Sequence, residues 1–195
     1  MPAIVVPKSA IATGPGYVYL APLGTSLPAN TVVGSVFTDT WASAGAWFVV
    51  GVTKSGSEFD YKIGTSPIVA AEYFDPLQIV TTDRAASYIF ELMQISATGL
   101  KNALNGGSLS TSGAGTTLLS SYTPPVPGSE VRTMLGWESQ SNDERLVFEQ
   151  CFQVGELKIV RDKGASNATM PLEFDAELPA SGFPFRYWTA GTVRS

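Results

Sequence analysis

The chain has 195 residues, enough for one domain with its own apolar core. Its single cysteine, Cys151, excludes an internal disulfide, and the absence of histidine removes the commonest general base and the commonest metal ligand. The net charge of -5 argues against a protein that holds nucleic acid by its phosphates, because such binding depends on Lys and Arg.

The first quarter of the chain carries almost no charge. Residues 1 to 53 contain only Lys8 and Asp39 among their charged groups. This segment either meets a partner or forms a pair of core strands after a short disordered start. No apolar run reaches the roughly 18 residues that span a bilayer, and the N-terminus lacks the features of a signal peptide. We therefore expect a soluble protein that is not exported and has no membrane partner.

Short segments of alternating character, bounded by Gly, Pro, Asn and Ser, predict antiparallel strands through most of the chain. Between residues 57 and 63, for example, Phe59, Tyr61 and Ile63 alternate with charged residues. The predicted strands are 16–20, 46–53, 57–63, 68–74, 77–82, 85–95, 130–138, 145–153, 156–161, 169–178 and 185–190.

One segment, about 96–105, has helical spacing instead. Ser96 is a suitable N-cap, and Asn105 with Gly106 can adopt the left-handed conformation that ends a helix. The uncharged stretch 105–128, rich in Gly, Ser, Thr and Pro, predicts a surface loop with one edge strand near 116–122. We expect residues 1–195 to form a single domain.

Few residues point to catalysis. Cys151 lies in a strand-like run without a base, which favours a buried structural thiol. Glu173, Asp175 and Glu177 alternate with apolar residues and could in principle serve glycoside hydrolysis, but any half-solvated strand shows this pattern. Two aromatic clusters, around 41–48 and 183–188, indicate either a sugar platform, a protein interface or ordinary core, and core is favoured.

The order of these elements resembles the major tail protein, or tail tube protein, of long-tailed bacteriophages with non-contractile tails. The resemblance lies in Gly16 to Gly24, then Trp47, then Gly51 to Gly56. A long hairpin through Ile79, the strand 85–95 and the helix ending at Gly106-Gly107 continue it.

The resemblance implies an antiparallel β-sandwich or barrel-type tail tube fold with one short flanking helix. Six copies would form a ring, and rings would stack into a hollow tube for viral DNA. The implied partners are further copies, the tape measure, tail terminator and distal tail proteins, and double-stranded DNA that passes without specific binding. The implied location is the virion tail, after assembly in the host cytoplasm. We expect no enzymatic activity, cofactor or metal.

An acidic inner wall would let DNA slide without sticking. The lumen-lining candidates are Glu72, Asp75, Glu91, Glu149, Glu173, Asp175 and Glu177. A lumen lined mainly by Lys54, Lys62, Arg132 and Arg145 would contradict this hypothesis.

Contacts between subunits and rings are expected from the uncharged arm and from aromatic residues. The interface candidates are Ile4, Val5, Val6, Trp41, Trp47, Phe59, Tyr61, Tyr187 and Trp188. We expect the arm at 1–15, part of the hairpin at 54–66 and the stretch 187–195 to become ordered only between subunits. Deletion of residues 2 to 13 should stop tube growth and leave a folded monomer.

Other functions stay open at this level. A carbohydrate-binding or adhesin-like β-sandwich would use the aromatic clusters as its platform. Another virion structural role, such as a capsid-decorating or head-to-tail protein, fits the same composition. Tubes of contractile tails and of secretion systems share the fold by family resemblance.

Overall fold

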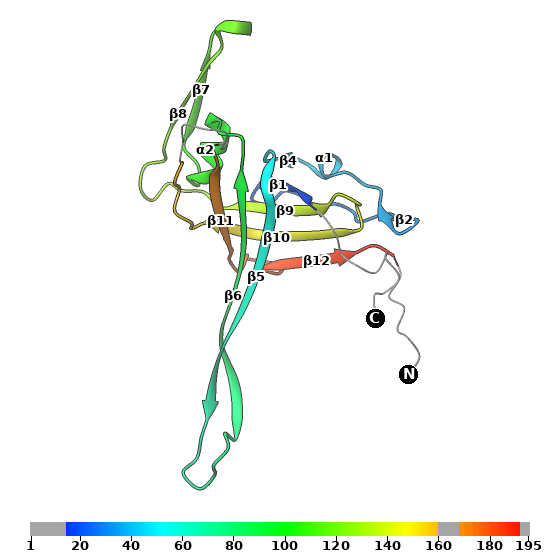
Figure 1. Ribbon diagram of the computed structural model, residues 1–195, viewed down its shortest axis with the longest axis vertical. Coiled ribbons are helices and arrows are strands. Elements are labelled where there is room, and N and C mark those ends of the chain that lie inside the picture. The colour runs from blue at the N-terminus through cyan, green and yellow to red at the C-terminus, as the bar shows by residue number, and fades with distance from the viewer. Residues whose placement is uncertain (1–14, 160–167, 192–195) are drawn as a thin grey trace.

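The computed structural model describes residues 15–159 and 168–191, and its main element is a large antiparallel sheet that carries a long projecting hairpin (Figure 1). The strands are Gly16–Pro22 (β1), Val32–Val33 (β2), Val36–Phe37 (β3), Phe48–Val49 (β4), Thr53–Ile68 (β5), Gln78–Leu92 (β6), Ser108–Ser112 (β7), Leu119–Thr123 (β8), Thr133–Ser139 (β9), Glu144–Gln153 (β10), Met170–Ala176 (β11) and Phe185–Thr189 (β12). The helical elements are Trp41–Ala44 (α1), Ala97–Ala103 (α2) and the 3-10 turn Gly115–Thr117 (η2). The prediction of a mainly β, antiparallel fold is confirmed.

The sheet has the order β4-β1-β9-β10-β11-β6-β5, and it branches at β10. One side of β10 pairs with β9. The other side pairs with β12 along Glu144 to Phe148 and with β11 along Cys151 to Gln153. The branching turns the β11-β6-β5 part of the sheet across the β1-β9-β10 part, so the two parts enclose a core between them (Figure 1).

The first core lies inside this bend. Alternate residues of β6 point into it, from Ala86 to Leu92, and they meet Leu172 and Phe174 of β11. Aromatic contacts join the two parts of the sheet, because the ring of Phe59 lies 5.3 Å from that of Phe185 and 6.1 Å from that of Phe148. A strand with one face in the core alternates between apolar and polar residues, which is why the strand predictions succeed here.

A second core covers the opposite face of β1, β9 and β10. Trp41 stacks on Tyr19 with 4.6 Å between ring centroids, and Trp47 meets Trp41 edge-on at 4.7 Å. Met134 and Val147 complete this core. The preference for burial of the 41–48 aromatic cluster is therefore confirmed for Trp41 and Trp47 but wrong for Phe48, which is exposed. Trp41 also begins α1, a four-residue helix, so the expectation of a single helix is wrong.

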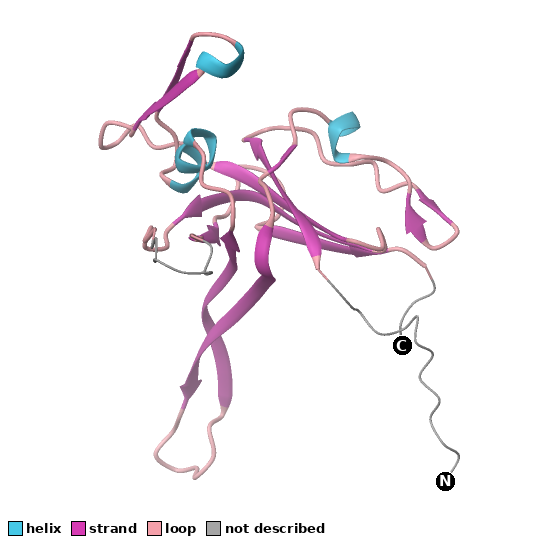
Figure 2. Cartoon of the chain, turned by 45° about the horizontal axis from the view of Figure 1, so that its top comes forward, coloured by secondary structure: helices cyan, strands magenta, loops and turns pink. Residues whose placement is uncertain are grey.

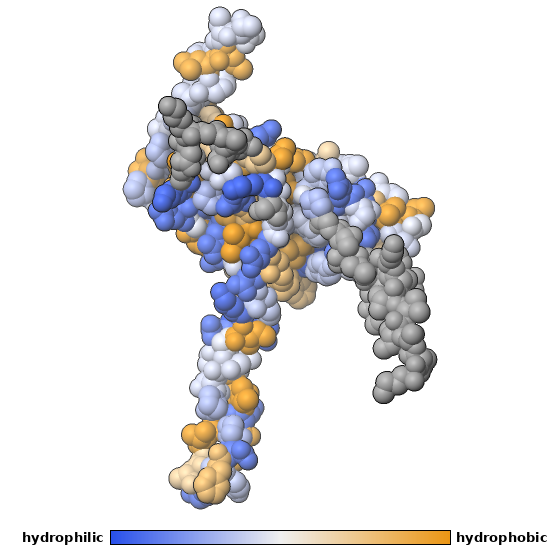
Figure 3. All heavy atoms as spheres, viewed as in Figure 1, coloured by the Kyte–Doolittle hydropathy of each residue, from blue (hydrophilic) through white to orange (hydrophobic). Residues whose placement is uncertain are grey.

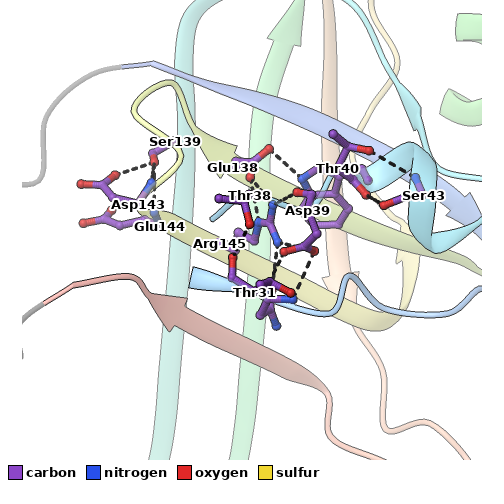
Figure 4. A network of polar contacts seen from close by, with 12 residues as sticks. Thr31, Thr38, Asp39, Thr40, Ser43, Glu138, Ser139, Asp143, Glu144 and Arg145 are labelled. Carbon is purple, nitrogen blue, oxygen red and sulfur yellow. Dashed lines mark hydrogen bonds and ion pairs between the residues drawn. The ribbon is translucent and has the colours of Figure 1, made fainter. Parts of the chain in front are cut away.

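Arg145 holds the segment before α1 against the sheet (Figure 4). Its guanidinium is 1% exposed, donates to Glu138 on β9, and reaches both the carboxylate and the backbone carbonyl of Asp39. Glu138 accepts a further bond from the indole of Trp41 at 2.9 Å. Burial alone would raise the pKa of Asp39, but hydrogen bonds from Arg145 and from two backbone amides hold it below its ordinary value.

The helix α2 matches the prediction closely. The Ser96 hydroxyl accepts from the amide of Gly99 at 3.0 Å, and Asn105 and Gly106 have φ values of 53° and 123°. The side chain of Asn105 also exchanges two hydrogen bonds with the backbone of Gln153 at the end of β10. These two hydrogen bonds fix the end of α2 to the central strand β10.

The hairpin of β5 and β6 is longer than predicted. The strand expected at 68–74 is wrong, because β5 runs without interruption to Ile68 and residues 69–77 form the connecting tip. The strands expected separately at 77–82 and 85–95 are one strand, β6. Local polarity near Asp83 and Arg84 misled the prediction, since both faces of the projecting hairpin are exposed and no alternation is required there.

Three further segments differ from the sequence analysis. The stretch 105–128 contains a whole hairpin, β7 paired with β8, where one edge strand was expected (Figure 2). The described part of 156–161, residues 156–159, is not a strand, although Leu157 and Ile159 pack against the first core. Only two residues of the predicted strand 46–53 form β4. Among the described residues, no helix is long and apolar enough to cross a membrane.

Candidate functional site

Five carboxylates gather on the outward face of β5, β6 and β11, and we call this surface the acidic face. The register places Glu58 and Glu173 on either side of Ile89, and Asp60 and Asp175 on either side of Ser87. Directly paired residues of an antiparallel sheet share one face, so these four carboxylates point the same way. Glu91, paired with Pro171, is the fifth.

Two lysines lie among these carboxylates. Lys54 pairs with Glu91 at 3.5 Å and Lys62 with Asp60 at 2.8 Å, and both lysine side chains are more than half exposed. The hydrogen bond and the charge of Asp60 raise the pKa of Lys62, and Glu173 and Asp175 add to the effect. Burial raises the pKa of Asp175, and Lys62 opposes that shift. Exposed pairs of this kind contribute little to stability, and the face as a whole stays negative.

The seven lumen-lining candidates do not form one site. Glu91, Glu173 and Asp175 belong to the acidic face. Glu72 and Asp75 lie in the tip of the β5-β6 hairpin, away from the sheet. The two remaining candidates, Glu149 and Glu177, are bound to arginines.

Glu149 forms an ion pair with Arg186 and accepts from the amide of Phe183. Glu177 accepts from Arg132 at 3.1 Å and from Gln150 at 2.7 Å. Bonds from Arg132 and Gln150 lower the pKa of Glu177, so it stays ionised but carries its own counter-charge.

Sequence reasoning missed Glu58 and Asp60 as members of the acidic face. Their alternation with Phe59 and Tyr61 was visible, but the pairing of β5 beside β6 and β11 was not. That pairing is what brings them near Glu173 and Asp175.

The interface candidates fall into three groups. Trp41 and Trp47 are buried in the second core, at 2% and 6% exposed, and Trp188 packs against that core. Packing within the chain therefore accounts for these three tryptophans without a contact to another subunit. Ile4, Val5 and Val6 lie outside the described residues.

Phe59, Tyr61 and Tyr187 form the third group, which is exposed. Phe59 and Tyr61 keep about two fifths of their surface free while their rings contact Phe185. Tyr187, which is half exposed, lines a small hollow together with Phe59, Trp137 and Leu146. These aromatic residues offer an apolar surface beside the edge strand β12.

The structure also locates the four basic residues that would contradict an acidic channel wall if they lined the lumen. Arg145 is buried and cannot line any channel. Arg132 pairs with Glu177, and its guanidinium lies 4.7 Å from the ring centre of Phe152. Lys54 and Lys62 lie on the acidic face itself, each beside a carboxylate.

The projecting hairpin extends away from the sheet (Figure 3). Phe74 in its tip is fully exposed, and Val69, Tyr73 and Leu77 are each more than half exposed. From Tyr61, the last contact with Phe185, β5 runs seven further residues to Ile68, or roughly 20 Å at ~3.3 Å per residue. Apolar side chains exposed on this scale indicate an interaction surface.

A protein-family model described as phage tail tube protein matches residues 6–158 of the chain. The match covers more than half of the chain, and the chain belongs to this family of structural proteins. It is therefore a component of the virion tail, as the sequence resemblance implied.

Other comparisons add little. A comparison with curated protein sequences gives no match. A cryo-EM structure of the anti-feeding prophage baseplate, symmetrised six-fold, is similar at 10% identity over 95% of this chain and 98% of that chain, with a TM-score of 0.45. A likeness at this level carries no argument about assembly.

Proposed function

We propose that this protein is the repeating subunit of the hollow tube of a long, non-contractile phage tail, and that it catalyses no reaction. Six copies form a ring, rings stack, and the acidic face of each copy lines the channel. The observation that carries the proposal is the acidic face, where five carboxylates outnumber two lysines on neighbouring strands.

The acidic face suits a channel for DNA because charge of the same sign keeps the phosphates from binding. A basic wall would release counterions from DNA and hold it in place. A negative wall lets a long polyanion move past many subunits without a position at which it binds strongly.

The edge of the sheet supports ring formation. Among the described residues β5 pairs only with β6, so its outer edge carries unpaired backbone groups along much of 16 residues. Exposed edges of this length recruit further strands. In the proposed ring this edge pairs with a strand of the neighbouring copy, and six copies close the sheets into one inner barrel.

The tape measure, tail terminator and distal tail proteins are the proposed partners in the virion, by family resemblance. Double-stranded DNA passes through the tube without specific binding. The carbohydrate-binding alternative loses its best platform, because Trp41 and Trp47 are occupied in the second core.

The test has two parts. Negative-stain microscopy of the purified protein at high concentration should show hollow tubes or rings. Tubes of a Glu173→Lys/Asp175→Lys variant should then retain DNA that wild-type tubes release at the same salt concentration. A Glu130→Lys/Glu156→Lys variant changes the net charge equally at other surface positions and should behave as wild type. Equal DNA retention by all three proteins would contradict an acidic channel wall.

A further inference from the structure

The acidic face contains two cations, Lys54 and Lys62, on the surface that the proposed function turns toward DNA. Lys62 is the more exposed of the two, since 78% of its side chain is accessible against 54% for Lys54. A lysine that is free to move on a channel wall would bind phosphates and displace their counterions. Passage of DNA without binding therefore depends on what holds the Lys62 ammonium group.

Asp60 holds this ammonium group. Residues two apart on a strand point to the same face, so Asp60 and Lys62 stand side by side on β5. The Asp60 Oδ2 lies 2.8 Å from the Lys62 Nζ, and among the described residues no other carboxylate forms an ion pair with this lysine. The Asp60 side chain is 34% exposed, so the carboxylate is the less exposed member of the pair.

Glu173 and Asp175 on β11 act on Lys62 only through their charge. Asp175 lies across Ser87 from Asp60 in the paired strands. The hydrogen bond and the charge of Asp60 raise the pKa of Lys62 most, and the charges of Glu173 and Asp175 add to the shift. The position of the ammonium group therefore depends mainly on Asp60.

Glu58 carries the same charge as Asp60 on the same strand but lies elsewhere. Four residues of β5 separate it from Lys62, or roughly 13 Å at ~3.3 Å per residue. It adds negative charge to the acidic face without contacting the lysine. The two carboxylates thus differ in their contact with Lys62, which makes Glu58 a matched control.

We infer that Asp60 is a positioning residue for DNA passage, which holds the Lys62 ammonium group against the channel wall and so keeps it from binding phosphates. This inference rests on the proposed function and gives the carboxylates of the acidic face two roles. Most of them repel the phosphates, whereas Asp60 neutralises a neighbouring cation. One exposed ion pair is weak, but DNA passes the same pair in every copy, so a small difference per copy adds up along the tube.

DNA retention by assembled tubes tests this role. Asp60→Asn and Glu58→Gln each remove one negative charge with little change of shape, but only Asp60→Asn releases Lys62. Tubes of Asp60→Asn should retain duplex DNA at about 50 mM salt and release it by about 200 mM, because phosphate binding by lysine weakens steeply with salt. Tubes of Glu58→Gln should release DNA as wild-type tubes do at both concentrations.

A double variant isolates the contribution of the lysine. Asp60→Asn/Lys62→Gln has the net charge of the wild type and lacks the released cation, so its tubes should release DNA normally. Equal retention by Asp60→Asn and Glu58→Gln, or retention by the double variant, would overturn the inference and leave the proposed function standing. Wild-type protein that forms no tubes at any concentration would overturn the proposed function and this inference with it.

Amine labelling provides a second readout that needs no tubes. A limiting amount of an acetylating reagent at pH 8 reacts with free amines, and mass spectrometry measures the modification of each lysine. Lys62 should be acetylated faster in folded Asp60→Asn than in the wild type or in Glu58→Gln. Lys54, whose partner is Glu91, should react alike in all three proteins. An unchanged rate at Lys62 in Asp60→Asn would show that Asp60 does not hold the ammonium group and would overturn the inference.

Discussion

Arg145 on β10 lies directly opposite Glu138 on β9, and its Nε donates to the Glu138 carboxylate at 2.7 Å. Both side chains are almost completely buried. Arg145 also reaches Asp39 in the segment before α1, so one guanidinium joins two strands to the segment that covers them. The second core depends on this junction because Trp41 follows Asp39 by two residues and also bonds Glu138.

Substitution of Arg145 should destabilise the fold strongly. Arg145→Met leaves the Glu138 and Asp39 carboxylates without their shared cation, and such a loss costs about 3 to 5 kcal/mol. Urea unfolding followed by tryptophan fluorescence measures the change. Lys62→Met breaks an exposed pair and should lower the free energy of unfolding far less. Similar losses from both variants would show that the buried junction has no special role.

The same junction predicts a loss of stability in acid. Since the folded pKa of Asp39 lies below its ordinary value of 3.8, its ionised form stabilises the fold above that value. This contribution declines as the pH falls through the lowered folded pKa. The free energy of unfolding of Asp39→Asn should therefore be lower than that of wild type at pH 7, and the two should converge as the pH falls through the lowered folded pKa of Asp39. A difference that does not change with pH would contradict this origin.

Gly136 on β9 should tolerate no side chain. A Cβ at this position would overlap the six-membered ring of Trp41, which lies against the β9 backbone while it stacks on Tyr19. Gly136→Ala should cost about 1 to 3 kcal/mol through overpacking. In the double variant Gly136→Ala/Trp41→Phe the smaller ring relieves the clash, so the combined loss should be smaller than the sum of the single losses. Additive losses would mean that the two residues do not interact.

Cys151 should be chemically inert in the folded protein. Burial raises the pKa of its thiol to about 12, and the thiol donates to the carbonyl of Thr133 at 3.3 Å. A thiol reagent at pH 8 should label Cys151 only after the chain is unfolded in urea. The Phe74→Cys variant should label fully at one additional site under native conditions. Rapid native labelling of the wild type would contradict the buried position.

Neutralisation of Asp175, in β11, and of Glu177, just after β11, should change the stability in opposite directions. Burial raises the pKa of Asp175, so its ionised form disfavours folding at neutral pH, and this penalty disappears as the pH falls below its ordinary value of 3.8. Arg132 and Gln150 lower the pKa of Glu177, so its ionised form favours folding at neutral pH.

Thermal unfolding at pH 7 measures this contrast. The midpoint should rise slightly in Asp175→Asn and fall in Glu177→Gln, and both shifts should shrink in acid. Shifts of the same sign would show that the local partners do not set these two pKa values.

Much of the fold follows from local sequence signals. The strands β6 and β11 alternate between apolar and polar residues because one face enters a core, and Ser96 and Gly106 bound α2 as their chemistry requires. The projecting half of the hairpin has no core face, so no period marked its length. The α1 helix was missed because four residues held by Thr40 and by Trp41 packing leave almost no periodic signal.

The candidate site was only partly predictable. Glu173 and Asp175 were visible as one face of a strand, but their grouping with Glu58 and Asp60 depends on the pairing of β6 with β11, which lies about 80 residues further along the chain. Likewise, nothing local indicated that Asn105 would bind the backbone of Gln153 or that Arg145 would bind Asp39. Contacts between residues far apart in the sequence determine both the acidic face and these hydrogen bonds.

Cryo-EM reconstruction of the assembled protein would show directly which face of each copy lines the channel. We expect a hollow tube of stacked six-membered rings in which Glu58, Asp60, Glu173 and Asp175 of every copy project into the channel. A tube with these carboxylates on its outer wall or buried between rings, or a protein that stays monomeric, would contradict it.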